Sequence, residues 1–143
     1  MSRSILDEIP DMDKKKATKL VVYGLILAII GISVLIVSYS IASNAGSWQN
    51  IAIQENQINF WEGFYGYNEY LERNVEISRT YSWMTFQDAI FGSIGQIVIF
   101  IGLAIMFIGI LSHAMDKTSD NKIRLVFTIL AAVVIYLLVI ALI

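Results

Sequence analysis

The sequence contains no cysteine and only one histidine, and both shortages limit the chemistry open to the chain. Structural zinc sites, iron–sulfur clusters and most haem sites are built from Cys and His ligands. The chain cannot supply such a ligand set alone. Its single histidine, His113, is expected to be solvated or to interact favourably with the carboxyl end of a helix. We therefore expect no metal and no cofactor. Lipid is the one small molecule that we expect to be bound.

Motifs that carry catalysis or nucleic-acid binding are also missing. There is no nucleophile motif, no phosphate-binding glycine loop, no nucleic-acid motif and no N-glycosylation sequon. Glu69, Glu72 and Glu76 are spaced by three and four residues, so they share one helix face, where Arg73 and Arg79 offset part of their repulsion. This pattern is typical of a solvated acidic face. The sequence predicts a protein that is not an enzyme and has no nucleic-acid partner.

Charge is scarce, at 15% of residues, and three long runs have none: residues 20–42, 89–111 and 125–143 lack Asp, Glu, Lys, Arg and His. A hydrocarbon core of ~30 Å is crossed by about 20 mostly apolar helical residues. The chain is therefore predicted to be a single membrane domain, residues 1–143, of the all-α integral membrane class. Its transmembrane helices are expected at about 20–42, 88–112 and 122–143.

Lys and Arg are distributed unevenly over the segments that join these helices. Eight of them lie in or beside residues 1–19 and 113–121, whereas only Arg73 and Arg79 lie in residues 43–87. Short cytoplasmic loops are enriched in Lys and Arg. We therefore expect a cytoplasmic amino terminus, an extracytoplasmic segment 43–87, a cytoplasmic connection 113–121 and an extracytoplasmic carboxyl terminus, in the cell membrane.

The first apolar run also resembles a secretory signal, because its last residues, Ser40–Ala42, resemble a small-residue cleavage site. Its length of 23 residues exceeds the usual signal core of about 7–15 residues. A retained signal anchor is favoured, and cleavage stays the alternative. Two helix starts are also predicted, one near Thr85, where Thr85 and Asp88 form a capping-box pattern, and one after Asp120.

Small residues recur every seven positions in the first two apolar runs. Positions seven apart drift by only ~20° around a helix, so each set forms one stripe. The first stripe is Gly24, Gly31 and Ser38, and the second is Gly95, Gly102 and Gly109. In lipid, small residues let helix backbones approach closely. We expect an antiparallel seam with Gly24 opposite Gly109, Gly31 opposite Gly102 and Ser38 opposite Gly95. A partner subunit's helix, or a groove for a lipid or quinone-like ligand, are the alternatives.

Gln96 is the most polar residue inside a predicted transmembrane helix, and we expect its amide to bond to a neighbouring helix.

The segment 43–87 is unusually aromatic for a solvated linker. Helix is expected at about 47–76, interrupted near 63–66, and an extended strand-like stretch at 74–83. Aromatic residues are enriched in interface cores, which favours contact with partner subunits. A lipid-interface belt and a sugar- or quinone-stacking site are the alternatives. The expected contact residues are Trp48, Phe60, Trp61, Phe64, Tyr65, Tyr67, Tyr70, Tyr81 and Trp83.

A small Cys-free three-pass chain with one aromatic outer segment resembles, in form, the accessory subunits of respiratory or membrane-bound monooxygenase complexes. That resemblance implies a noncatalytic structural subunit whose partners are other membrane protein subunits and lipid. The alternative is a small homo-oligomeric channel or transporter in which Gln96 and the glycine stripe line the path.

Overall fold

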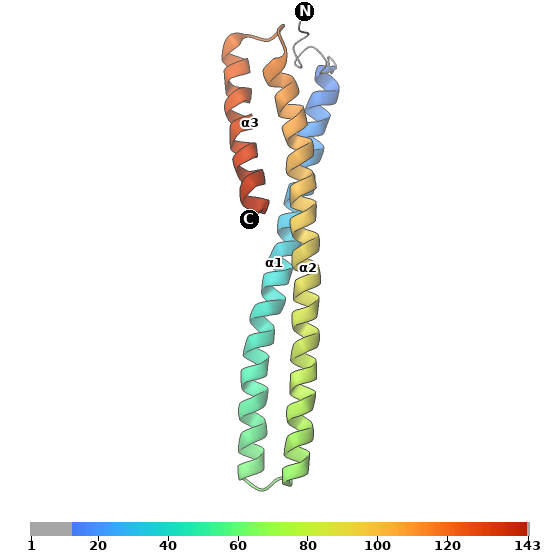
Figure 1. Cartoon of the computed structure of the whole chain (residues 1–143), viewed down its shortest axis with the longest axis vertical. Helices are drawn as coiled ribbons and strands as arrows, with labels where there is room; N and C mark the ends of the chain where they lie inside the picture. The colour runs from blue at the N-terminus through green and yellow to red at the C-terminus, as the bar shows by residue number, and fades with distance from the viewer. Residues whose placement is uncertain (1–12, 143) are drawn as a thin grey trace, which may run out of the picture. The chain divides into compact units, whose positions relative to one another are not determined.

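The computed structural model describes residues 13–142, which form three α-helices (Figure 1). They are α1, Lys14–Trp61, α2, Tyr67–Met115, and α3, Asn121–Leu142. No strand occurs in this part of the chain. Each helix contains a window long and apolar enough to cross a membrane, by length and composition. The prediction of an all-helical chain with three candidate membrane spans is therefore confirmed.

The ends predicted for the first two transmembrane helices do not coincide with the ends of α1 and α2. Helix α1 continues from residue 42 to Trp61, and α2 begins at Tyr67 rather than near Thr85. An apolar run ends at the membrane surface, but the helix can continue beyond that point. Its backbone hydrogen bonds are made within the helix, so they also form in water. Residues 43–61 and 67–87 contain no proline to stop them. Residues 47–61 and 67–76 are helical, as the helix expected at about 47–76 with a break near 63–66 requires. The sequence analysis missed that these segments are continuous with the apolar helices.

The connection between α1 and α2 is a short turn with a recognisable geometry. The Gly63 N–H donates to the Phe60 carbonyl at 3.1 Å, and the Phe64 N–H donates to the Asn59 carbonyl at 3.0 Å. This pair of bonds is the Schellman motif, which needs a left-handed residue, and Gly63 has φ 79°. The break expected from the glycines near 63–66 falls at residues 62–66.

Two local expectations from the outer segment are wrong. Residues 74–83 are helical within α2 instead of extended, because alternation over ten residues is weak evidence against a continuous packed helix. Thr85 does not cap α2. Its hydroxyl donates to the Ser82 carbonyl inside the helix at 2.9 Å. The expected start of α3 is confirmed, since Asp120 immediately precedes Asn121 and its carbonyl accepts from the Arg124 N–H at 3.0 Å.

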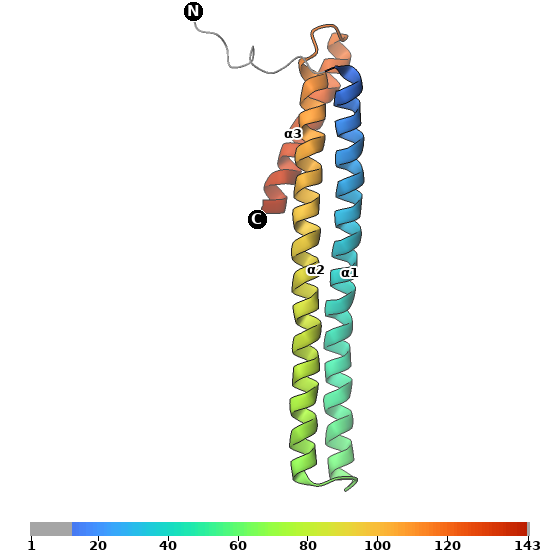
Figure 2. The ribbon, with the colours of Figure 1, turned by 90° about the vertical axis from the view of Figure 1, so that its right-hand side faces the viewer.

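The chain divides into two compact units, which are described separately. Unit 1 comprises Met1–Ile32 and Gln96–Ile143, of which 13–32 and 96–142 are described, and unit 2 comprises Ser33–Gly95. In unit 1, α3 lies beside the carboxyl-terminal part of α2 (Figures 1 and 2). Its core consists of Leu103, Ile110, Ala131 and Val134. No large side chain is fully buried in the described residues, as expected for helices that pack through small contact surfaces.

Candidate functional site

The closest helix contact in unit 1 is built on three of the predicted glycines. A Cβ atom added at Gly24 would lie 2.5 Å from the Gly102 carbonyl oxygen, and one added at Gly102 would lie 2.6 Å from the Ala28 nitrogen. At Gly109 it would lie 2.6 Å from the Ala17 oxygen. The backbones of α1 and α2 therefore touch at these positions. No room for a side chain is left between the two helices at these three residues.

The expected register of the seam is wrong. Gly24 lies against Gly102 and Met106 instead of Gly109, and Gly109 lies against Ala17 and Val21. Pairing the stripes residue to residue assumed that glycines face glycines at equal membrane depth. In knobs-into-holes packing, each small residue instead sits between residues of the facing helix. The remaining stripe members, Gly31 and Gly95, are buried.

Ser38 is buried in unit 2, where its expected neighbour was Gly95. Its hydroxyl lies 2.5 Å from Asp88 Oδ1 and 3.0 Å from the Asp88 carbonyl oxygen, and a Cβ added at Gly92 would lie 3.1 Å from the same hydroxyl. Ser38 is therefore a donor to Asp88, not only a small spacer. The sequence contained this signal, because Asp88 and Ser38 both stand at heptad positions of their helices.

Gln96 lies on an exposed face of α2, in unit 1. Its side-chain amide makes no hydrogen bond to any described residue, so the bond expected to a neighbouring helix is not made within residues 13–142. Gly24, Gly102 and Gly109 pack against α1 or α2, whereas the Gln96 amide has no partner among the described residues.

The predicted aromatic contact residues fall into two groups in unit 2. Four are exposed, with Trp61 the most at 82%: Trp61, Phe64, Tyr67 and Trp83. Five are half-buried: Trp48, Phe60, Tyr65, Tyr70 and Tyr81. Phe60 contacts three neighbouring rings, the closest being Tyr70 at 4.8 Å between centroids. Phe60, Trp61, Tyr67 and Tyr70 thus form a ring cluster beside the turn at residues 62–66, and Trp61 and Tyr67 also expose much of their area.

A buried asparagine holds the two helices of unit 2 together. Asn56 is 4% exposed, and its amide nitrogen donates to the Tyr70 carbonyl at 3.2 Å and to Asn74 Oδ1 at 3.0 Å. The Tyr65 hydroxyl donates to the Asn56 carbonyl at 2.9 Å and also contacts its side-chain oxygen. Sequence reasoning missed Asn56. Asn56 stands eleven residues after the buried Ala45, about three helical turns, so the sequence already placed it on the same helix face.

A cavity of about 260 Å³ lies beside this asparagine. Its α1 wall includes Trp48, Glu55 and Asn59, and its α2 wall includes Arg73, Glu76 and Thr80. The Arg73 guanidinium carbon lies 4.8 Å from the centre of the Tyr65 ring, and its Nη2 lies 3.3 Å from Glu69 Oε1. The cavity combines aromatic, amide and charged groups, which the linear sequence does not bring together.

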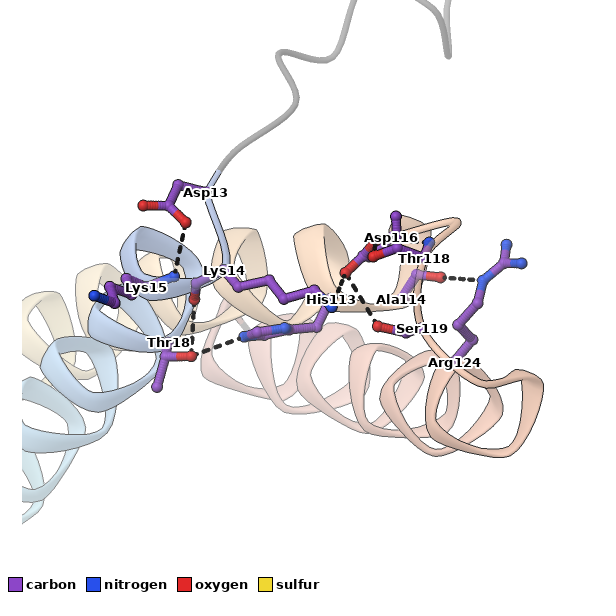
Figure 3. A network of polar contacts seen from close by, with 10 residues as sticks. All are labelled: Asp13, Lys14, Lys15, Thr18, His113, Ala114, Asp116, Thr118, Ser119 and Arg124. Atoms are coloured by element: carbon purple, nitrogen blue, oxygen red, sulfur yellow. Dashed lines mark hydrogen bonds and ion pairs between the residues drawn. The ribbon is translucent and has the colours of Figure 1, made fainter.

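The remaining polar network lies in unit 1, where the start of α1 meets the end of α2 (Figure 3). The Thr18 hydroxyl donates to the Lys14 carbonyl at 2.9 Å, so it accepts from His113 Nε2, 3.2 Å away. The His113 ring also stacks on Phe127 of α3 at 4.7 Å. His113 is half-buried and bonded in the last turn of α2. Of the two expected placements, the solvated ring is therefore wrong, and the position at the carboxyl end of a helix is confirmed.

Asp116, in the turn between α2 and α3, anchors the same network. The backbone N–H and hydroxyl of Thr118 donate to Oδ1 at 2.9 and 2.6 Å, while Lys14 Nζ lies 3.1 Å and the Ser119 hydroxyl 3.0 Å from Oδ2. These Thr118 bonds, followed by Lys14, hold the pKa of Asp116 well below its ordinary value. Arg124 Nε donates to the Ala114 carbonyl at 3.2 Å, so all three helices are tied here.

The described residues contain no group of three or more His, Cys, Asp or Glu side chains placed to hold a metal ion. Comparison with known protein families, with curated proteins and with solved structures finds no match for this chain. Gln96 and the exposed aromatic residues are the groups that make the fewest contacts with the described part of the chain.

Proposed function

We propose that this chain is a noncatalytic accessory subunit of a larger multi-subunit membrane complex, stabilising the assembly through helix packing and its aromatic outer segment. The observation that carries the proposal is Gln96, whose amide is exposed on α2 without a partner in the described chain. A respiratory or membrane monooxygenase complex is the type that the overall form resembles.

The position of Gln96 makes its exposure informative. It stands seven residues into the apolar run 89–111, so at about 1.5 Å per residue it lies ~10 Å inside that run. An amide facing hydrocarbon has no water to bond, and an interhelical hydrogen bond there contributes about 0.6–2 kcal/mol. A polar group on another membrane helix is the partner that this amide lacks. The proposal places a subunit contact at this depth.

The aromatic residues outside the apolar runs support a second contact. Trp61, Phe64 and Tyr67 are exposed around the turn at residues 62–66, and Trp83 is exposed on α2. Large rings of this kind are enriched in the buried centres of protein interfaces. Their exposure in the single chain is therefore consistent with coverage by partner subunits. Lipid covers the remaining apolar faces of the membrane helices.

The charge distribution supports the orientation within this proposal. Seven described Lys and Arg residues lie at the start of α1 and around the start of α3: Lys14, Lys15, Lys16, Lys19, Lys117, Lys122 and Arg124. The positive-inside rule assigns that end to the cytoplasm. The retained signal anchor, the extracytoplasmic outer segment and carboxyl terminus, and the plasma membrane location belong to the same proposal.

Site-specific photocrosslinking tests the membrane contact. A photoreactive phenylalanine analogue is placed at Gln96 in the full chain in its native membrane, and the same residue at Ile97 is the control. Ile97 is also exposed, at 58%, but is turned by about 100° on the same helix. Crosslinks from position 96 to other proteins, in a fixed ratio, are expected. Labelling of lipid alone at both positions would contradict the proposal.

A crosslink only between two copies of this chain would favour the alternative, a homo-oligomeric channel or transporter in which Gln96 lines the path. In that case Gln96→Leu should alter solute flux through liposomes containing the purified protein. For an accessory subunit, Gln96→Leu should instead weaken recovery of the partners without creating or removing any flux, while Ile97→Leu leaves recovery unchanged.

A further inference from the structure

We infer that an exposed stripe at the start of α1 binds an anionic phospholipid, with the headgroup phosphate held by Lys15 and Lys19 and an acyl chain along Val22 and Ile26. All four residues belong to unit 1. The inference does not depend on the proposed accessory role, because it needs only that α1 crosses a membrane. The length and composition of α1 are sufficient for that.

The four residues share one face of α1. At about 100° per residue, positions 15, 19, 22 and 26 lie within about 60° of one another around the helix axis. All four are exposed, Val22 at 46% and Ile26 at 48%. The stripe therefore changes from basic to apolar along its length, as the surface of a phospholipid changes from charged to apolar.

The basic half of the stripe lies at the depth of the lipid headgroups. The charge-free run 20–42 begins directly after Lys19, and Lys15 lies one turn, about 6 Å, farther out. The headgroup layer on each side of a bilayer is about 5–8 Å thick. Lysine side chains are long enough to place their ammonium groups in that layer. Both ammonium groups are therefore within reach of lipid phosphates.

The charge around this stripe favours an anion. Residues 14–19 include four lysines, and the described carboxylates beside them are Asp13 and Asp116. Asp116 lies 3.1 Å from Lys14 Nζ, and Asp13 accepts from the Lys15 backbone N–H at 3.4 Å. Neither Lys15 nor Lys19 forms an ion pair with a described residue. In Figure 3 the Lys15 side chain points away from Lys14 and Asp116.

This excess of positive charge distinguishes between classes of phospholipid. Basic residues beside a transmembrane helix attract anionic lipids, whose headgroups carry a net negative charge. A zwitterionic phospholipid offers the same phosphate together with its own cation, which is repelled by the two lysines. The stripe is therefore expected to prefer an anionic phospholipid over a zwitterionic one with identical acyl chains.

The apolar half of the stripe distinguishes a lipid from a free phosphate ion. Val22 and Ile26 expose nearly half of their area next to the basic pair. In a bilayer, acyl chains cover apolar surface of this kind. A phospholipid contacts both halves of the stripe at once, and joining the two contacts in one molecule raises its affinity. Inorganic phosphate would contact only the lysines.

Native mass spectrometry of the full-length chain in detergent tests the inference. The probe is dioleoylphosphatidylglycerol, and the reference is dioleoylphosphatidylcholine, which has the same acyl chains and no net charge. Each lipid is titrated and the dissociation constant of the first bound lipid is measured. Tighter binding of phosphatidylglycerol is expected. Inorganic phosphate, added as a competitor, should not displace it.

Glutamine substitutions locate the site. Each lysine near an anionic headgroup contributes about 1 kcal/mol, so Lys15→Gln and Lys19→Gln should each weaken phosphatidylglycerol binding about fivefold. The double variant should weaken it about 25-fold, with phosphatidylcholine binding unchanged. Lys117→Gln is the matched control. Lys117 is exposed in the turn after α2, so its substitution removes the same charge away from the stripe and should leave the affinity unchanged.

Three results would overturn the inference. Equal binding of the two lipids would show that the lysines do not select a headgroup, as would happen if acidic residues elsewhere in the chain already neutralised them. Displacement by inorganic phosphate would show that the apolar half adds nothing. Equal weakening by Lys117→Gln and Lys15→Gln would show that net charge alone is responsible.

Helical circular dichroism separates loss of binding from misfolding. The Lys15 and Lys19 side chains are exposed and form no ion pair or side-chain hydrogen bond with a described residue, so both variants should keep the helicity of the parent. Weaker phosphatidylglycerol binding with intact helicity supports the site.

Discussion

Unit 1 and unit 2 hold segments of the same two helices together by different chemistry. In unit 1 the backbones touch at Gly24, Gly102 and Gly109. In unit 2 the contact depends on side-chain bonds, from Ser38 to Asp88 and from Asn56 to Asn74. The difference follows from where each unit lies along the sequence. Within the apolar runs, lipid offers little drive for helix association beyond close packing. Most of unit 2 lies outside those runs and contains amides and rings that bond and stack, and its Ser38–Asp88 bond lies near the end of the first run.

The strongest test of this comparison is overpacking in unit 1. Gly102→Leu should separate α1 from α2, because even a Cβ atom would lie 2.6 Å from the Ala28 nitrogen. Overpacking of this kind costs about 1–3 kcal/mol or more. The measurement is the free energy of unfolding in detergent, followed by helical circular dichroism.

Gly46→Leu is the matched control for Gly102→Leu. Gly46 is also a helical glycine, but a Cβ atom there meets nothing within 4 Å. We expect an unchanged or slightly higher stability, since leucine favours helix over glycine by up to about 1 kcal/mol. Equal losses for the two variants would show that the close contact at Gly102 is not what stabilises unit 1.

A weaker effect is expected from breaking the polar contact of unit 2. Asn56→Ala removes the bonds to Tyr70 and Asn74 and leaves the Tyr65 hydroxyl without its side-chain acceptor. The Tyr65 hydroxyl keeps the Asn56 backbone carbonyl as an acceptor, so the expected cost is that of the lost hydrogen bonds, about 0.5–1.5 kcal/mol each. Amide hydrogen exchange should become faster around residues 56–74. Asn50→Ala, at an exposed position, is the control. Unchanged exchange in the Asn56 variant would contradict a stabilising role for this contact.

The smallest effect is expected at the exposed network of unit 1. The pKa of Asp116 is lowered in the folded chain, so the stability that its carboxylate contributes is complete above its ordinary value. That stability is lost only as the pH falls below the ordinary value toward the lowered one. Asp116→Asn should therefore lower the melting temperature slightly at pH 7 and less, or not at all, in strong acid.

A comparison with a Lys14 variant sharpens the Asp116 test. Lys14 Nζ lies 3.1 Å from Asp116 Oδ2, but the Thr118 bonds are the larger cause of the lowered pKa. Lys14→Gln should therefore reproduce only part of the Asp116→Asn effect at neutral pH. Equal effects of the two single variants would assign the whole contribution to the ion pair.

Local sequence signals predicted local structure well. Three charge-free runs located three helices, the glycines near 63–66 located the turn, and Asp120 located the start of α3. Each of these features depends on neighbouring residues. The extended stretch at 74–83 and the cap at Thr85 failed because packing of α2 against α1 overrode short patterns of this kind.

The sequence by itself determined the number of helices, their membrane-spanning lengths and the stripes of small residues, because hydropathy and helical periodicity are properties of adjacent positions. Only the tertiary structure decided which glycine meets which residue, that Asn56 and Asn74 bond, and that Gln96 has no partner among the described residues. Those facts depend on the register of one helix against another. Register is set by how side chains and backbones interlock across the seam, and no single stretch of sequence contains that information.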